Sequence, residues 1–150
     1  MKKSCILLFL LISATALYAQ SADNLSDIIK TKNATYGQVA YLTGVYQGTV
    51  QEDASFGQAF DLYKANGLIS QSAKQSDVIP LQEVAFLCAR ATGLKGGLFY
   101  SIFHNSRYAY KELKAKKILP FSVDPGMTIS GRDAIALLNG CVGLTGGNEE

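Results

Sequence analysis

The sequence predicts an all-α protein in which three helix–loop–helix repeats pack as a pseudo-threefold bundle after an N-terminal signal peptide. Three observations lead to this prediction. The chain begins with two lysines and an apolar run, residues 59–94 align without a gap on residues 109–144, and apolar residues in the aligned segments recur with the 3.6-residue period of a helix. No stretch shows the sustained alternation that is typical of a strand.

Residues 1–19 have the three-part layout of a secretory signal peptide. Lys2 and Lys3 precede the apolar run Ile6–Ile12, and small residues follow up to Ala19. Cleavage after Ala19 fits this layout, and a site a few residues earlier is an alternative. A membrane-spanning helix needs about 20 apolar residues, so the shorter run favours export over an anchor. We therefore expect an exported protein that is periplasmic or associated with the cell envelope.

The net charge and the length of the chain limit the classes of function that fit it. The chain has 14 basic and 12 acidic residues, and removal of Lys2 and Lys3 leaves 12 of each. A mature protein without net charge does not fit a nucleic-acid binder, which carries a strong basic excess. The remaining chain of about 130 residues is long enough for one domain with a hydrophobic core. We place this domain at 20–144, with a flexible tail at 145–150.

An internal repeat is the strongest feature of the sequence. The alignment of 59–94 with 109–144 contains 8 identities, where about two are expected by chance. Residues 35–48 align in turn on 80–93, so the second half of the unit occurs three times. We place the units at about 25–48, 55–94 and 105–144. The identities of the longer alignment are Ala59, Lys64, Ala65, Ser72, Ile79, Leu87, Gly93 and Leu94 with Ala109, Lys114, Ala115, Ser122, Ile129, Leu137, Gly143 and Leu144.

Each half of the unit is predicted to form an amphipathic helix. The first halves are expected at Leu25–Lys32, Ser55–Asn66 and Asn105–Lys117. Cys88 and Cys141 fall on the apolar stripes of the second halves, so we expect buried thiols, with a disulfide in an oxidising compartment as the alternative. The stripes consist of Val39, Leu42 and Tyr46, of Val84, Leu87, Cys88 and Ala91, and of Ala134, Leu137, Leu138 and Cys141.

Start and stop signals accompany the second halves. The spacing of Thr35–Gln38 is that of a capping box, and Ser130–Asp133 is close to one. Gly48, Gly93 and Gly143 stand where helices commonly end, because glycine adopts the left-handed backbone of a helix C-terminus without strain. These signals mark the predicted starts and ends of the second-half helices.

Several short motifs occur in the order of a known repeat. The third unit contains Arg107–Tyr110, Ile118-Leu119, an Asp124–Gly126 turn and Ile129–Asp133, and the second unit has a similar series within Ser55–Leu94. This series resembles the S-layer homology repeat, which reads approximately H-W-A-Y, I, L, G-I-I, D-G and I-T-R-A-E-F. The resemblance covers most of the mature chain. It implies an exported protein that folds as a bundle of helical repeats, usually three, and attaches to cell-wall polysaccharide.

The chain departs from this family where the wall contact is expected. The motif arginine falls on Tyr36, Leu81 and Gly131 in the three units. Neither leucine nor glycine offers the planar set of donors by which a guanidinium recognises an anionic sugar group. Glu83 and Asp133 match the acid of the motif, and we interpret them as helix-start charges. The resemblance therefore implies the scaffold without its usual ligand site.

Two groups of residues are the candidate ligand contacts. An aromatic insert between the second and third units has no counterpart in the first connection, and such inserts often bind ligands in repeat proteins. A cationic helix face follows it and fits an anionic envelope polymer or lipid headgroup. The alternatives are an insert that covers the core and a helix face that is merely solvated. The candidate ligand-binding residues are Phe99, Tyr100, Phe103, Arg107, Tyr108, Lys111 and Lys114.

Catalytic and metal-binding patterns are weak in the sequence. His104 is the one histidine of the chain, and no acid is placed to orient it beside Ser101. One histidine and the two separated cysteines that remain after removal of the signal peptide do not form a zinc set. We therefore expect no catalytic residue, no metal site and no cofactor.

These observations favour a non-catalytic envelope module that binds a cell-wall polysaccharide or an envelope protein as an anchor or scaffold. Peripheral association with a membrane stays open. A protein–protein adapter that uses the aromatic segment 99–110 is the alternative, and a small secreted hydrolase that depends on His104 is a third, weaker hypothesis.

Overall fold

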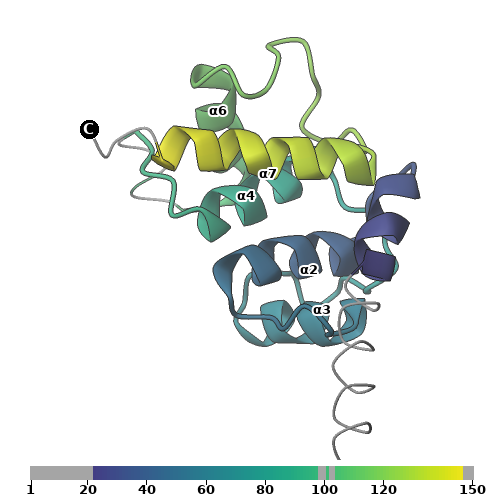
Figure 1. The fold of residues 1–150 in the computed structure, drawn as a ribbon. Coiled ribbons are helices and arrows are strands. Elements are labelled where there is room, and N and C mark those ends of the chain that lie inside the picture. Colours follow the sequence, from purple (N-terminus) through teal and green to yellow (C-terminus); the bar gives the residue numbers. More distant parts are fainter. Residues whose placement is uncertain (1–21, 98–100, 102–103, 147–150) are drawn as a thin grey trace, which may run out of the picture.

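The computed structural model describes residues 22–97, 101 and 104–146, and within them the chain folds as helices joined by loops (Figure 1). The predicted all-α class is confirmed. A helix covers residues 22–30, and the others are α2 (Tyr36–Gln47), α3 (Phe56–Ala65), α4 (Leu81–Ala91), α6 (Ser106–Ala115) and α7 (Gly131–Gly146). The predicted signal peptide at 1–19 lies outside the described residues.

The helix starts follow local sequence signals. Thr35 and Gln38 form the predicted capping box of α2, because each side chain accepts a hydrogen bond from the backbone N–H of the other residue. Ser130 and Asp133 form the corresponding pair before α7. A further capping box, which was not predicted, begins at Ser55 and starts α3. These pairs satisfy N–H groups that a helix start leaves without an intrahelical partner.

Gly48 and Gly93 end α2 and α4, as predicted, with φ angles of 70° and 63°. The predicted end at Gly143 is wrong, because α7 continues to Gly146. In these last turns the Thr145 hydroxyl donates to the carbonyl oxygen of Val142 at 3.0 Å, and the chain stays helical. Helix α7 thus includes residues 145 and 146, which were predicted as part of a flexible tail, and residues 147–150 lie outside the described part.

The apolar stripes of the second halves point inward. Val39, Val84 and Ala134 are 1%, 0% and 1% exposed, and they occupy equivalent positions in α2, α4 and α7. These three helices contact one another and form the centre of the molecule. Tyr46 is an exception to the predicted stripe, since it is 46% exposed. Helix α2 packs against α3, α4 and α7, so its buried surface extends around to Thr43.

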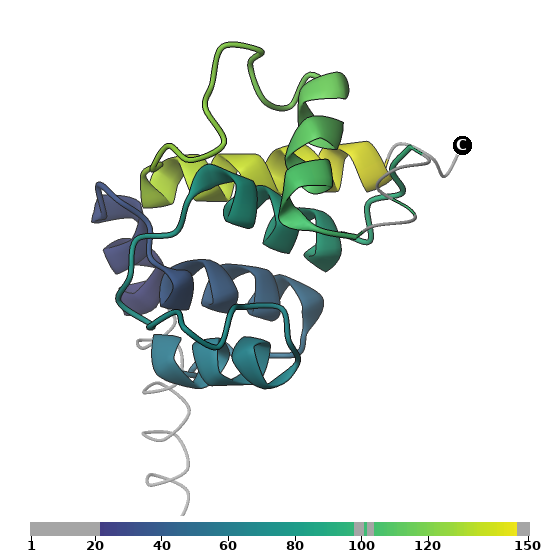
Figure 2. The same ribbon diagram turned by 180° about the vertical axis from the view of Figure 1, so that it is seen from behind.

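The first-half helices surround this centre. Helix α3 packs on α2, and α6 packs on α4. Figure 2 shows the same order from behind, with α3 at one edge, α2 and α4 next, and α7 beyond them. The helix over 22–30 lies beside the N-terminal ends of α2 and α7 in both views. Each first-half helix thus contacts the second half of a neighbouring unit.

Main-chain hydrogen bonds link the starts of the three central helices. The first residue of each helix donates its N–H to the segment that precedes another central helix. Through these bonds α2 is joined to the segment before α4, α4 to the segment before α7, and α7 to the segment before α2. The donor and acceptor pairs are Tyr36 with Asp77 at 3.1 Å, Leu81 with Met127 at 2.9 Å, and Gly131 with Thr31 at 3.0 Å.

Candidate functional site

The cationic face predicted on the third unit lies on α6. Arg107 and Lys111 are exposed and stand one helical turn apart. The Lys111 ammonium lies 5.7 Å from the centroid of the half-buried Tyr108 ring, which is the distance of a cation–π contact. These residues present two positive charges to solvent on one side of the helix.

Lys114 has a structural role. Its ammonium donates to the carbonyl oxygen of Phe121 at 2.6 Å and to the hydroxyl of Tyr110 at 3.2 Å, and it lies over the Tyr110 ring. Lys64, the aligned lysine of the second unit, donates in the same way to the carbonyl oxygen of Ala73 at 3.0 Å. The repeat identity at this position therefore reflects a lysine that holds the following loop against its helix.

The aromatic insert falls mostly outside the described residues, since Phe99, Tyr100 and Phe103 are not among them. Ser101 and His104 are described, and both are exposed. The Ser101 hydroxyl donates to the carbonyl oxygen of Gly96 at 3.2 Å. The predicted ligand contacts of the insert thus stay predictions.

The positions of the family's motif arginine are occupied by packing residues. Leu81 is 2% exposed and belongs to the core. At Gly131 an added Cβ would stand 1.9 Å from the carbonyl oxygen of Ile28, so no side chain fits there. Tyr36, the third position, is half-buried, and burial raises the pKa of its hydroxyl, with smaller contributions from Glu83 and Asp77. A guanidinium at Leu81 or Gly131 is therefore incompatible with this packing.

The two acids that match the motif differ in environment. Asp133 is exposed and accepts a hydrogen bond from the Ser130 hydroxyl at 2.7 Å, within the cap of α7. Glu83, in the first turn of α4, is half-buried. Burial raises the pKa of the Glu83 carboxyl, and a hydrogen bond with the Ser106 side chain partly offsets that effect. Both acids stand at helix starts, as interpreted from the sequence.

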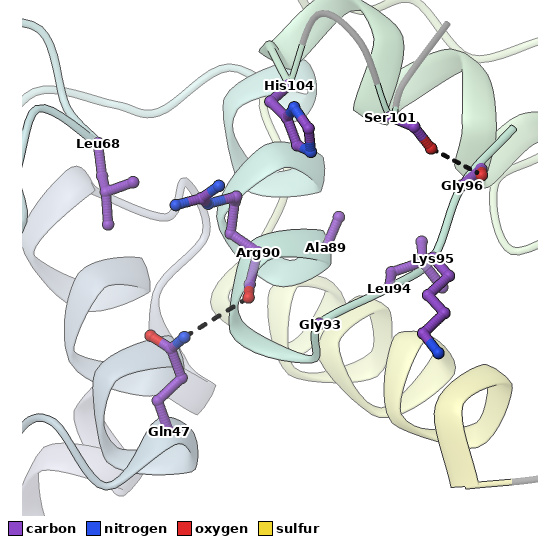
Figure 3. A pocket seen from close by; sticks show the side chains of 10 residues that line it. All are labelled: Gln47, Leu68, Ala89, Arg90, Gly93, Leu94, Lys95, Gly96, Ser101 and His104. Atoms are coloured by element: carbon purple, nitrogen blue, oxygen red, sulfur yellow. Dashed lines mark hydrogen bonds between the residues drawn. The ribbon is translucent and has the colours of Figure 1, made fainter. Parts of the chain in front are cut away.

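A pocket of about 500 Å³ opens at the C-terminal end of α4 (Figure 3). Its cationic lining comes from Arg90 and Lys95, and His104 also lines it. Figure 3 shows the Arg90 side chain extending between Leu68 and His104. The full lining is Gln47, Leu68, Ala89, Arg90, Gly93, Leu94, Lys95, Gly96, Ser101 and His104, and no carboxylate occurs among these described residues.

Arg90, Lys95 and Gln47 were not predicted as site residues. They lie at the ends of two helices and in the connection after α4, and they share no sequence motif. The one available signal was the Gly96-Gly97 pair before the aromatic insert, since it marked this connection as different from the first one. The convergence of these residues depends on the packing of α2 against α4.

Cys88 and Cys141 are buried and free in the structure. Burial raises the pKa of Cys141 to about 11 and that of Cys88 well above its ordinary value, with a smaller effect of Cys141 on Cys88. Within the described part of the chain, no three His, Cys, Asp or Glu side chains gather in a way that could hold a metal ion. No helix there is both long and apolar enough to span a membrane.

Comparison with family models, with curated proteins and with solved structures finds no match for this chain.

Proposed function

We propose that this chain is a non-catalytic, exported module of the cell envelope that binds an anionic wall polymer. In this proposal three repeats like those of the S-layer homology family form a pseudo-threefold scaffold. The observation that carries the proposal is the set of main-chain bonds at the starts of α2, α4 and α7. Each bond joins the first residue of one central helix to the segment before another, so the three units are linked in a closed cycle.

Between the first and second units, and between the second and third, the positions of these bonds follow the alignment of the repeats. Beside the bonds of the first helical residues, Gly37 donates to Gln75 at 3.0 Å, and Gln82 donates to Pro125 at 3.0 Å. The donors are equivalent, because Gly37 of the first unit aligns with Gln82 of the second. The acceptors are equivalent too, because Gln75 of the second unit aligns with Pro125 of the third. Unrelated helices would not be expected to reproduce the same donors and acceptors at successive junctions. The repetition therefore supports a repeat scaffold of the kind that the sequence resembles.

The ligand contact in this proposal is the α6 face. Leu81 and Gly131 cannot supply the family's arginine contact, whereas Arg107 and Lys111 are exposed and adjacent on α6. Two surface cations beside the Tyr108 ring suit an anionic polymer, whose repeated charges add many weak contacts. The adapter hypothesis depends on the segment 99–110, of which Phe99, Tyr100 and Phe103 lie outside the described part of the chain.

Retention on isolated cell-wall material tests the proposal. The mature protein is mixed with walls at low salt, and the bound fraction is compared with that of an Arg107→Gln, Lys111→Gln variant. We expect retention by the parent and roughly tenfold weaker retention by the variant, because two cations that face the polymer are lost. Salt should release the parent, since exposed charges are screened within about 10 Å at 0.1 M.

A Lys30→Gln, Lys32→Gln variant is the matched control, because both residues are exposed and it loses the same charge elsewhere. Equal weakening in the two variants, or no retention of the parent at low salt, would remove the wall-polymer hypothesis. Retention that resists high salt and requires wall-associated protein would favour the envelope-protein partner instead.

A further inference from the structure

The pocket at the end of α4 has a fixed framework. The Gln47 side chain donates to the carbonyl oxygen of Arg90 at 3.5 Å and accepts from the Tyr63 hydroxyl at 3.1 Å. Both ends of the Gln47 amide are therefore used to join α2, α3 and α4 beneath the pocket. The backbone of Arg90 is held in place, and its side chain lines the pocket between Leu68 and His104 (Figure 3).

The opposite wall is formed by the chain that leaves α4. Gly93 has a φ of 63°, and the N–H of Leu94 donates to the carbonyl oxygen of Ala89 at 3.0 Å, so the chain reverses direction here. The Ser101 hydroxyl donates to the carbonyl oxygen of Gly96, and both residues line the pocket. His104 follows with a φ of 36°, an uncommon backbone for a residue with a side chain.

Electrostatics of the pocket favour an anion. Arg90 and Lys95 carry positive charge at its lining, and none of the described lining residues is acidic. The one described ion pair joins Lys116 to Glu112, so no described carboxylate is paired with Arg90. The carbonyl oxygens at the end of α4 would oppose an anion, but those of Cys88, Ala89 and Arg90 already accept hydrogen bonds.

We propose that this pocket binds a small organic molecule through an oxyanion, a carboxylate or a phosphate, with Arg90 as the main contact. A guanidinium offers paired N–H donors that match the two oxygens of such a group. Lys95 and His104 also line the pocket, and Leu68 offers an apolar surface beside the Arg90 guanidinium. The volume of about 500 Å³ lies in the range of small-molecule sites, about 300–1,000 Å³, and fits a monomer or the end of a polymer.

This inference does not depend on export or on wall binding. The pocket is lined by none of Arg107, Tyr108 and Lys111, which form the contact of the proposed function. A protein that ignores cell walls could bind the small anion, and a protein that binds walls through α6 could leave this pocket empty. Failure of the wall-retention test and failure of the small-anion titration can therefore be told apart.

The experiment is a titration of the full mature protein, followed by the backbone amide signals in NMR and by calorimetry. Inorganic phosphate and a monomeric uronic acid are the two anionic probes, and the corresponding neutral hexose is the third. We expect one anion to shift the amide signals of residues 89–96, while the hexose leaves them unchanged. Phosphate binding would assign a phosphate-bearing ligand, and uronate binding would assign a carboxylate-bearing one.

Arg90→Gln should weaken binding of that anion by about tenfold or more, because a hydrogen bond to a charged group is lost. Arg132→Gln is the control, since Arg132 is exposed on α7 and does not line the pocket. The amide spectrum of each variant reports whether it remains folded. The proposal is overturned if neither anion shifts the amide signals of residues 89–96 at concentrations up to about 10 mM. That concentration is ten times the dissociation constant of a weak site, about 1 mM. Equal loss of binding in both variants also overturns it.

Discussion

At the scale of single residues, the ends of α3 and α6 offer a direct comparison. In both helices the residue that follows the C-cap has a left-handed backbone. Its φ angle is 70° at Gly67 and 61° at Lys117. Aligned bonds close both turns, from Leu68 to Tyr63 and from Ile118 to Leu113, each at 2.9 Å. The second unit has a glycine at this position, and glycine adopts this backbone freely. The third unit has a lysine, whose Cβ makes this backbone unfavourable.

Lys117→Gly should therefore stabilise the protein. We expect the free energy of unfolding to rise by roughly 0.5–1 kcal/mol, because the left-handed backbone no longer strains a Cβ. Gly67→Ala is the reciprocal change and should lower it by a similar amount, since an added Cβ there meets no atom and only the backbone is affected. Denaturant unfolding measures both, and a Lys117→Gly variant less stable than the parent would contradict the expectation.

Glu83 should make stability depend on pH. Burial raises the pKa of this carboxyl, so the folded protein binds the proton more tightly than the unfolded chain does. This group therefore stabilises the fold below the unfolded value of 4.5, and that contribution is lost as pH rises through the folded value. Glu83→Gln removes the effect, so the stability of the variant relative to the parent should increase from about pH 4 to about pH 7.

Unfolding by denaturant at several pH values tests this expectation. Glu52→Gln, in an exposed loop, controls for the removal of one negative charge. The free energy of unfolding of Glu83→Gln relative to the parent could instead stay constant or fall as pH increases. That result would show that burial does not penalise the Glu83 carboxylate.

At the scale of elements, α3 and α6 are each tied to the following loop by a lysine. Lys64 and Lys114 are identical in the alignment, and both ammonium groups donate to loop carbonyl oxygens while lying over an aromatic ring. Loops of this length otherwise have few contacts, and the lysine bonds hold them near the helices. Such a role explains the identity without any ligand.

Lys114→Met should lower the free energy of unfolding by about 1–2 kcal/mol, because charged hydrogen bonds to the loop are lost. It should also speed amide exchange in residues 121–123. Lys111→Met is the matched control on the same helix and should cost less than about 0.5 kcal/mol, since its ammonium is exposed to solvent beside Tyr108. Equal destabilisation by the two variants would argue against the loop contact.

The contact between α7 and the helix over 22–30 depends on one missing side chain. An added Cβ at Gly131 would lie 1.9 Å from the Ile28 carbonyl oxygen, which is backbone and cannot rotate away. Gly131→Ala should therefore destabilise the protein by about 1–3 kcal/mol. Gly143→Ala, in the same helix but with no atom within 4 Å, should stabilise it by roughly 0.5–1 kcal/mol. Thermal unfolding that ranks the two variants in the opposite order would contradict this packing.

At the scale of the whole molecule, the closed interior should protect the thiols. Cys88 and Cys141 are 1% and 0% exposed, and burial raises the pKa of Cys141 to about 11. Alkylation at about pH 8 should thus be slow in the folded protein and should accelerate when denaturant unfolds it, because the thiolate is the reactive form. Labelling of the native protein as fast as of the unfolded chain would mean that the three central helices do not close over these residues.

Much of the fold and little of the pocket could be predicted from the sequence. Helix positions, the capping box at Thr35 and the inward face of Val39, Val84 and Ala134 depend on local spacing, so they follow from the chain alone. The end of α7 was misplaced, because a glycine such as Gly143 permits a helix end without requiring one. The cationic helix face was visible as a pattern, but the bonds that occupy Lys114 were not.

The sequence by itself thus determined the helical class, the repeated unit and the apolar faces, because these are set by periodicity along a few turns of chain. Only the tertiary structure decided that each first-half helix packs on a neighbouring unit, that Gly131 must lack a side chain, and that Arg90 and His104 line one pocket. Those features require residues far apart in the chain to meet. Contact between such residues is fixed by how helices pack, which no local pattern specifies.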